Sequence, residues 1–233
     1  MAQKGVIDIW GLSEVRNQSA LDTFHEKIEQ ATVEEYVAKL SNSGSFDRLA
    51  ILYRKSVFDP KSDFFEISRI KVSQGLRPGF AIRLAGKKND QEFMFMVNHL
   101  KCCFDKPSDF EKRRKQVRGM NSVADQNNDV PIIAVGDLNT RVSVETGELI
   151  DPAIKALIEG DGSYEWIRPK VLAQTEDNVS AFDDLGVDQP LRNAHHRLRG
   201  VTSMACMRQT IASTKDLTNR RFVGRFPVGK QRG

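Results

Sequence analysis

The order of elements along the chain predicts an α+β fold with a strand-rich middle. A β-rich run at residues 6–15 precedes a helix, which we expect over about 20–40. Several short strands follow, then a charged helix expected over 109–127 and a strand at 130–135. This order lacks the strict β-α-β alternation of a doubly wound fold, and it favours the α+β class.

Hydrophobic spacing predicts the first helix and the strands that follow it. The polar stretch SNSGS ends that helix, and two β-rich segments follow at 46–55 and 64–72. The apolar stripe that predicts the helix recurs at roughly helical spacing along one face: Leu21, Phe24, Ile28, Val37 and Leu40.

The next two segments predict a hairpin. RPGFAIRLAG (77–86) alternates so that Phe80, Ile82 and Leu84 face inward. The turn-like KKNDQ then leads into EFMFMVNHL (92–100), which reads as the partner strand.

The C-terminal part of the chain differs from the body. A short helix is expected over about 152–159, and beyond about residue 170 the periodicity weakens. Residues 191–233 hold ten Lys and Arg against one acid, so this tail carries a net charge of +9 while residues 1–190 carry −5. A basic tail can bind nucleic acid through its phosphates, although a disordered end without a partner has the same composition.

Composition bounds the class of protein. The 233 residues are 39% hydrophobic, which suits one sizeable domain or one and a half. Three cysteines without a C-x-x-C spacing favour a reducing compartment. The start MAQKGVIDIW lacks the build of a secretory signal, and no apolar run is as long as a membrane span, so a cytoplasmic location is favoured. The sequence leaves the oligomeric state open.

The end of the strand at 130–135 carries the first candidate site. Asp137 and Asn139 follow Gly136 in PIIAVGDLNT, and side chains two apart in an extended chain face the same way. If the extended geometry persists through the turn, we expect Asp137 and Asn139 to point into one cleft, while Gly136 lets a ligand or another strand come close. A carboxylate can orient or deprotonate water, and a carboxamide can donate to a phosphoryl oxygen. The same residue types also favour an ordinary strand-ending turn.

Glu14 and His99 end two other predicted strands. Glu14 interrupts the apolar run IWGLSEV, and a lone carboxylate suits Mg²⁺, which takes few protein ligands. His99 can hydrogen-bond a phosphate oxygen or exchange a proton near neutral pH. Taken singly, Glu14 also fits an exposed edge carboxylate, and His99 a half-buried histidine bonded to a backbone carbonyl.

In combination, these segments resemble the endonuclease/exonuclease/phosphatase superfamily, the deoxyribonuclease-I-like family. DIWGLSEV resembles the family's strand ending in Gln-Glu-Val, and DRLAILYRK its Gly-x-Ala-Ile-Leu-Tyr strand. RPGFAIRL and FMFMVNHLK resemble its Arg-Pro and Asn-Thr-His-Leu strands, and VPIIAVGDLNT its Gly-Asp-x-Asn strand. RRKQVRG lies where the family has a helix with Arg and Gln. These motifs cover about residues 1–141 in the family's order.

The resemblance implies a fold, an activity and roles for four residues. The fold would be two packed, mostly antiparallel β-sheets flanked by helices, a four-layer α/β/β/α sandwich. The activity would be Mg²⁺- or Mn²⁺-dependent hydrolysis of phosphoesters. Glu14 would bind the metal with Asp137, which would also orient or activate the attacking water. His99 would contact the scissile phosphate, and Asn139 would hydrogen-bond it.

The chain also departs from the family's pattern. Ser13 replaces the usual Gln before Glu14, and the closing Ser-Asp-His motif is missing. His195 and His196 lack the preceding aspartate, so the role of the family's catalytic histidine is not carried over to them. We therefore expect an incomplete sandwich, with a partial family domain over 1–170 and a divergent basic segment over 171–233.

Three functions remain open from the sequence. The first is a metal-dependent phosphodiesterase, a nuclease with DNA as the favoured partner because of the basic tail. The second is an inactive relic or nucleic-acid-binding module, which the missing Asp-His pair supports. The third is a phosphatase or lipid phosphodiesterase on the same scaffold, because a fold alone does not select the substrate.

Overall fold

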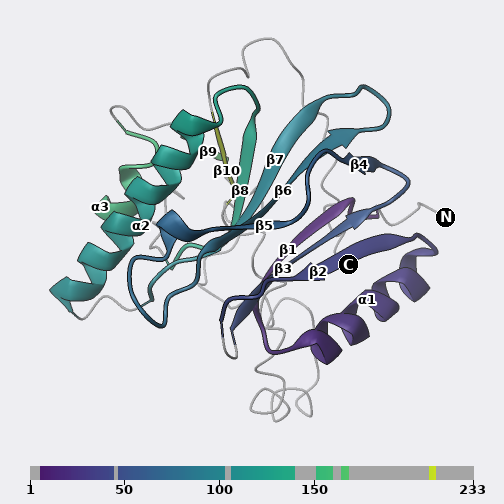
Figure 1. The fold of residues 1–233 in the computed structure, drawn as a ribbon, viewed down its shortest axis with the longest axis horizontal. Coiled ribbons are helices and arrows are strands. Elements are labelled where there is room, and N and C mark those ends of the chain that lie inside the picture. Colours follow the sequence, from purple (N-terminus) through teal and green to yellow (C-terminus); the bar gives the residue numbers. More distant parts are fainter. Residues whose placement is uncertain are drawn as a thin grey trace, which may run out of the picture.

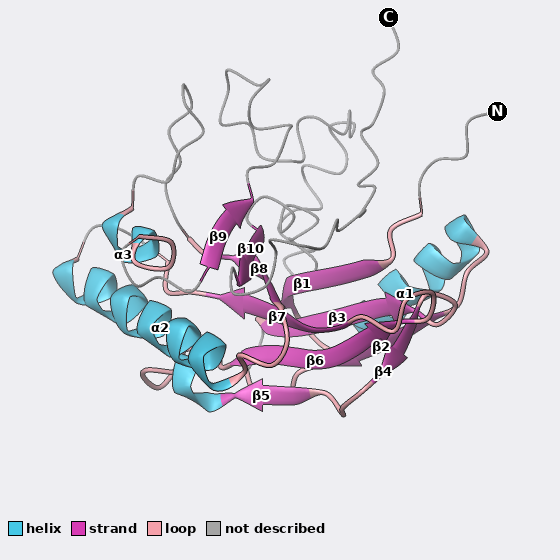
Figure 2. Ribbon diagram, turned by 90° about the horizontal axis from the view of Figure 1, so that it is seen from above, coloured by secondary structure: helices cyan, strands magenta, loops and turns pink. Residues whose placement is uncertain are grey.

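Helices cover the two outer surfaces of a pair of packed β-sheets (Figures 1 and 2). The computed structural model describes residues 6–44, 47–102, 106–139, 151–159, 164–167 and 210–213. The elements in the first half are β1 (Ile9–Val15), α1 (Gln18–Thr32), β2 (Tyr36–Leu40), β3 (Arg48–Arg54), β4 (Phe58–Pro60), β5 (Phe65–Ile67), the 3₁₀ helix η1 (Ser68–Ile70) and β6 (Gly79–Gly86). The remaining elements are β7 (Glu92–His99), α2 (Pro107–Gln126), β8 (Ile132–Asp137), α3 (Pro152–Lys155), β9 (Tyr164–Ile167) and β10 (Thr210–Ser213).

Strand pairing among the described residues defines a small and a large sheet. The small sheet has the order β1-β3-β2 and is antiparallel throughout. The large sheet has the order β4-β6-β7-β8-β10-β9, and β5 also pairs with β6. Its pairs are antiparallel except β7–β8, whose strands run parallel because α2 connects them.

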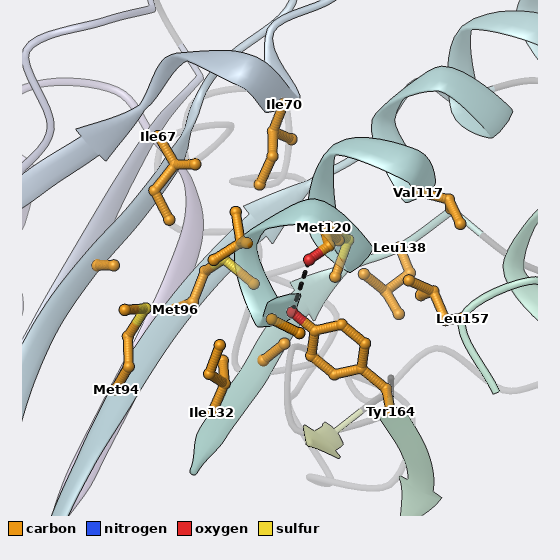
Figure 3. Close-up of a cluster of buried hydrophobic side chains, with 14 of the residues drawn as sticks. Ile67, Ile70, Met94, Met96, Val117, Met120, Ile132, Leu138, Leu157 and Tyr164 are labelled. Carbon is orange, nitrogen blue, oxygen red and sulfur yellow. Dashed lines mark hydrogen bonds between the residues drawn. The ribbon is translucent and has the colours of Figure 1, made fainter. Parts of the chain in front are cut away.

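Three hydrophobic clusters hold the four layers together. One joins α1 to the outer face of the small sheet, a second lies between the sheets, and a third joins the large sheet to α2 and α3. The alternation of β7 shows how one strand serves two of them. Phe95 and Val97 face the small sheet, whereas Met94 and Met96 face α2 (Figure 3). The predicted α+β four-layer sandwich is confirmed.

The structure confirms the two strands of the predicted hairpin and the side chains that they bury. Strands β6 and β7 pair antiparallel with Ile82 opposite Phe95. Phe80, Ile82 and Leu84 are all buried in the cluster between the sheets, as the alternation predicts.

The predicted helix over 20–40 is wrong in its C-terminal third. Helix α1 begins after Asn17, whose side chain accepts a hydrogen bond from the Ala20 amide, and it ends at Thr32. Val37 and Leu40 lie in β2 instead, where they pair with β3. Their apparent helical spacing is coincidental, because the chain reverses at Val33 in a left-handed conformation.

Other differences concern short elements. The strand predicted at 64–72 is limited to β5, since η1 follows it directly. Strand β4 and strand β9 are too short for periodicity to reveal. Strand β10 lies between β8 and β9 although its sequence shows no clear pattern. Long-range pairing therefore creates this strand.

Tyr164 fastens β9 to α2. Its ring is buried in the third cluster, and its hydroxyl donates to the carbonyl oxygen of Met120 at 3.0 Å (Figure 3). Burial raises the pKa of this hydroxyl well above its ordinary value, so it stays a donor at physiological pH.

Two sequence predictions are only partly covered by the structure. Apart from residues 210–213, the segment 171–233 lies outside the described residues, so the boundary at 170 stays a prediction. Among the described residues, no helix combines the length and apolar character needed to cross a bilayer.

Relief of backbone strain at Val33 is expected to stabilise the fold. Val33 has φ 57° and its side chain is 91% exposed, so a β-branched residue occupies a left-handed position without packing in return. Asn adopts this conformation at lower cost, and Val33→Asn should raise the free energy of unfolding by about 1 kcal/mol. Urea denaturation measures the change. Val37→Asn, in β2, is the contrasting control and should destabilise. A lower midpoint for Val33→Asn would contradict the strain argument.

Candidate functional site

Three strand ends from both sheets meet at the candidate site. Glu14 lies near the end of β1 in the small sheet, while His99 and Asp137 end β7 and β8 in the large sheet. The parallel register places His99 directly beside Asp137. β1 also packs against β7 and β8, which brings Glu14 to the same edge.

Both carboxylates approach the same imidazole nitrogen. His99 Nε2 is 3.9 Å from Glu14 Oε1 and 3.8 Å from Asp137 Oδ2. The His99 side chain is only 6% exposed, whereas those of Glu14 and Asp137 are 38% and 44% exposed. The arrangement is thus a buried imidazole flanked by two carboxylates that remain open to solvent.

A bulge in β1 directs Glu14 to this position. The pairing of β1 with β3 shifts register between Leu12 and Val15, and Glu14 has φ 58°. Such a conformation costs about 1–3 kcal/mol for a residue with a side chain and concentrates at functional positions. The bulge changes the strict alternation of the strand and sets where the carboxylate points.

Asn139 reaches the site by a route that the sequence did not predict. The extended geometry ends at Asp137, and Asn139 is left-handed with φ 47°. Its amide N–H donates to Asp137 Oδ1 at 2.8 Å, and its Nδ2 donates to the Leu100 carbonyl oxygen at 3.0 Å. The expectation of two side chains projecting together from an extended chain is therefore wrong. Asn139 holds Asp137 and the end of β7 in place.

Gly136 permits the close approach of a neighbouring strand. Its φ is 129°, and a Cβ at this position would lie 1.9 Å from the carbonyl oxygen of Asn98. The sequence left open whether a ligand or another strand approaches Gly136. In the structure, strand β7 makes this approach. This contact sets His99 and Asp137 side by side.

Burial and charge keep the His99 imidazole neutral. Burial lowers the pKa of His99 below its ordinary value of 6.5, and the nearby Arg77 charge lowers it further. Asp137, Glu14 and Asp47 act in the opposite direction and raise this pKa. Burial is the largest of these effects, so the ring is neutral at physiological pH and can carry one N–H donor.

Arg77 is a functional candidate that the sequence reasoning did not select. It precedes β6, and its side chain is held by Asp47: Nε donates to the Asp47 carbonyl oxygen at 2.6 Å and Nη2 to the carboxylate. Its charge acts on His99 and lowers the pKa of that imidazole. The Arg-Pro pair at the start of RPGFAIRL was the signal that could have identified it.

The donor set fits a hard divalent cation in part. Glu14 and Asp137 supply two carboxylates at one edge, and Mg²⁺ commonly uses one or two carboxylates together with water and substrate oxygens. No group of three or more His, Cys, Asp or Glu side chains in the described ranges is arranged to hold a metal by itself. Water and substrate oxygens would have to complete the coordination.

In the part of the chain that the structure describes, His99 is joined by no second histidine at the candidate site. His25 lies on α1, where its Nε2 is 3.0 Å from Glu29 Oε1 and 3.0 Å from the Tyr36 carbonyl oxygen. His195 and His196 lie outside the described residues. The described residues therefore supply no histidine in place of the Ser-Asp-His motif that the sequence lacks.

A pocket elsewhere on the molecule contains none of the candidate residues. Its volume is about 320 Å³, and it lies on the outer face between β5, β7 and the C-terminal half of α2. Its lining includes Ile67, Met94 and Val123, which belong to the cluster under α2. The chemistry of the site is thus on a different edge from this pocket.

Removal of the Arg77 charge is expected to raise the pKa of His99. Arg77→Met deletes the neighbouring cation and leaves Asp47 without its partner, and both changes favour the protonated imidazole. NMR titration of the His99 ring protons measures the shift. Arg69→Met is the matched control, because Arg69 is exposed on η1 and bonds Ser122 of α2. An unchanged His99 titration in Arg77→Met would show that the Arg77 charge does not contribute to this pKa.

Comparison with known proteins identifies the fold. No protein-family model and no curated protein matches the chain. Among solved structures, the human Nocturnin catalytic domain with bound sulfate anion aligns with a TM-score of 0.55 and 15% identity, covering 89% of this chain and 69% of that chain. A humanized D. rerio TDP2 aligns with a TM-score of 0.53 and 15% identity, covering 91% and 71%. D. rerio TDP2 complexed with single strand DNA product aligns with a TM-score of 0.50 and 17% identity, covering 78% and 58%.

At these identities the likeness concerns the fold. The chain therefore shares its fold with these Nocturnin and TDP2 structures, and it is the two-sheet α+β fold that the resemblance of the strand motifs predicts.

Proposed function

We propose that this chain is a metal-dependent phosphodiester hydrolase that acts on nucleic acid. One observation carries the proposal: two solvent-open carboxylates, from different sheets, flank the buried imidazole of His99. Phosphoryl transfer depends on charge neutralisation and positioning more than on covalent chemistry. Three kinds of group meet that need: carboxylates that bind a cation, a neutral donor to a phosphoryl oxygen and an oriented acceptor for the attacking water.

Each residue has a distinct proposed role. Glu14 and Asp137 would hold Mg²⁺ or Mn²⁺, which supplies neutralisation of charge on the phosphoryl oxygens. Asp137 accepts the Asn139 amide at one oxygen, so the carboxylate is oriented before water binds. The neutral His99 donates a hydrogen bond to a phosphoryl oxygen. The second N–H of the Asn139 carboxamide could reach the phosphate, while the first binds Leu100.

Nucleic acid is the favoured substrate class. The tail at 191–233 carries a net charge of +9, and such segments bind the phosphates of nucleic acids. The similar D. rerio TDP2 structure is complexed with a single strand DNA product, which is a property of that protein. These two facts support DNA before phospholipid or sugar phosphate.

The missing Asp-His motif favours a second candidate, a binding protein without catalysis. Such a protein would keep the half-site of Glu14, His99 and Asp137 and hold nucleic acid through the basic tail. Incubation of the purified protein with plasmid and with single-stranded DNA in the presence of Mg²⁺ separates the two. Salt-sensitive retardation of DNA without cleavage selects the binder, whereas cleavage selects the hydrolase.

Neutralising either carboxylate is expected to abolish most of the hydrolysis. Glu14→Gln and Asp137→Asn keep the shape of each side chain but remove the charge, so each should lower kcat by about 10²–10³-fold. Initial rates of Mg²⁺-dependent DNA cleavage measure the loss. Glu26→Gln on α1 and Asp63→Asn before β5 are matched controls, because both positions are exposed and remote from His99. Full activity in both site variants would refute the assigned site.

A further inference from the structure

A short segment after β7 carries the backbone that fixes the site. His99 ends the strand, and Leu100 and Lys101 follow it. The Leu100 amide donates to the Asp137 carbonyl oxygen at 2.9 Å, and its own carbonyl accepts from Asn139 Nδ2 at 3.0 Å. The position of this segment therefore decides how His99, Asp137 and Asn139 lie relative to one another.

Two buried side chains of α2 grip the next residue. Gln116 Oε1 accepts from the Lys101 amide at 2.8 Å, and Arg113 Nη1 donates to the Lys101 carbonyl oxygen at 3.2 Å. Gln116 is 0% exposed and Arg113 is 1% exposed. Both backbone polar groups of Lys101 are thus bound by side chains of α2.

Arg113 is itself held by Asp151. Its Nε lies 3.3 Å from Asp151 Oδ2, and the Asp151 side chain is 2% exposed. The other oxygen of Asp151 accepts the Ala153 amide at 2.8 Å and caps α3. Asp151 thereby supports the guanidinium as an ion-pair partner, although no hydrogen bond joins Arg113 Nε to Asp151 Oδ2.

A purely stabilising role does not account for this arrangement well. A buried ion pair is often no better for stability than apolar side chains of the same volume, because both ions lose their hydration. What an ion pair does supply is a fixed direction for its hydrogen bonds. Here the hydrogen bond of Arg113 is directed to the carbonyl oxygen of Lys101.

We infer that Arg113 and Gln116 are positioning residues for the site, with Asp151 as the support of Arg113. They hold Lys101 so that Leu100 stays bonded to Asp137 and Asn139. This inference rests on the proposed function for its catalytic consequence, but its structural consequence holds independently of activity. Neither residue touches the substrate in this scheme.

The main test removes the acceptor that binds the Lys101 amide. Gln116→Met keeps the length of the side chain and loses this hydrogen bond. We expect kcat to fall by roughly 10- to 100-fold with KM within about twofold, because misplacement of the site acts on the reacting geometry. We also expect the amide protons of Leu100 and Asn139 to exchange about tenfold faster or more in NMR hydrogen exchange.

A second variant covers the case in which Gln116→Met does not fold. Arg113→Lys keeps a cation beside Asp151 but loses the guanidinium fork that also reaches the Lys101 carbonyl. The same change in kcat and in Leu100 and Asn139 exchange is expected.

Two controls on the same helix separate positioning from loss of stability or of the amide group. Val123→Ala makes a cavity in the cluster under α2 without touching Lys101, and it should destabilise the protein while leaving Leu100 and Asn139 exchange changed only by the global term. Gln126→Met changes an exposed glutamine at the end of α2 and should leave all readouts unchanged.

The outcomes distinguish this inference from the proposed function. If the wild-type protein hydrolyses no substrate, the proposed function fails, and the exchange rates alone decide the positioning role. If Leu100 and Asn139 exchange in Gln116→Met and in Arg113→Lys follows global stability as in Val123→Ala, the positioning role is overturned.

Discussion

The parallel pairing of β7 with β8 is the constraint on which the rest of the site depends. The two strands come so close at Gly136 that no side chain fits against the Asn98 carbonyl. This register sets His99 beside Asp137, and the bonds that follow it continue the same contact through Leu100 and Asn139. Residues from the small sheet and from α2 surround His99 and Asp137 and support this alignment of β7 with β8.

Backbone strain appears at the two places where the site departs from regular β-structure. Glu14 and Asn139 both have a positive φ, and neither is a glycine. Each of them turns a functional group toward His99 or Asp137 that an ideal strand would direct elsewhere. The packed sandwich around them offsets the cost of these conformations, because Leu12, Val15 and Leu138 on either side are fully buried.

Burial outweighs the neighbouring carboxylates in setting the pKa of His99. Two carboxylates beside an imidazole would ordinarily hold it protonated, since each opposite charge favours the cation. The ring is nearly closed off from solvent and the charge of Arg77 disfavours its protonated form, so the pKa of His99 is lowered instead. A neutral imidazole beside two carboxylates carries one N–H donor, whereas a protonated imidazole would form ion pairs with them.

The sequence by itself determined the α+β class, the β6–β7 hairpin and the α2–β8 succession, because alternation and helical periodicity are local properties of each segment. It also named Glu14, His99, Asp137 and Asn139, since polar residues at the ends of apolar strands stand out in a pattern. Tertiary structure alone decided the end of α1 at Thr32, the place of β10 and the support of Lys101 by Gln116 and Arg113. It also decided that Asn139 binds Leu100 and that the charge of Arg77 acts on His99. These features arise from contacts between segments far apart in the chain, where no local spacing records which surfaces will meet.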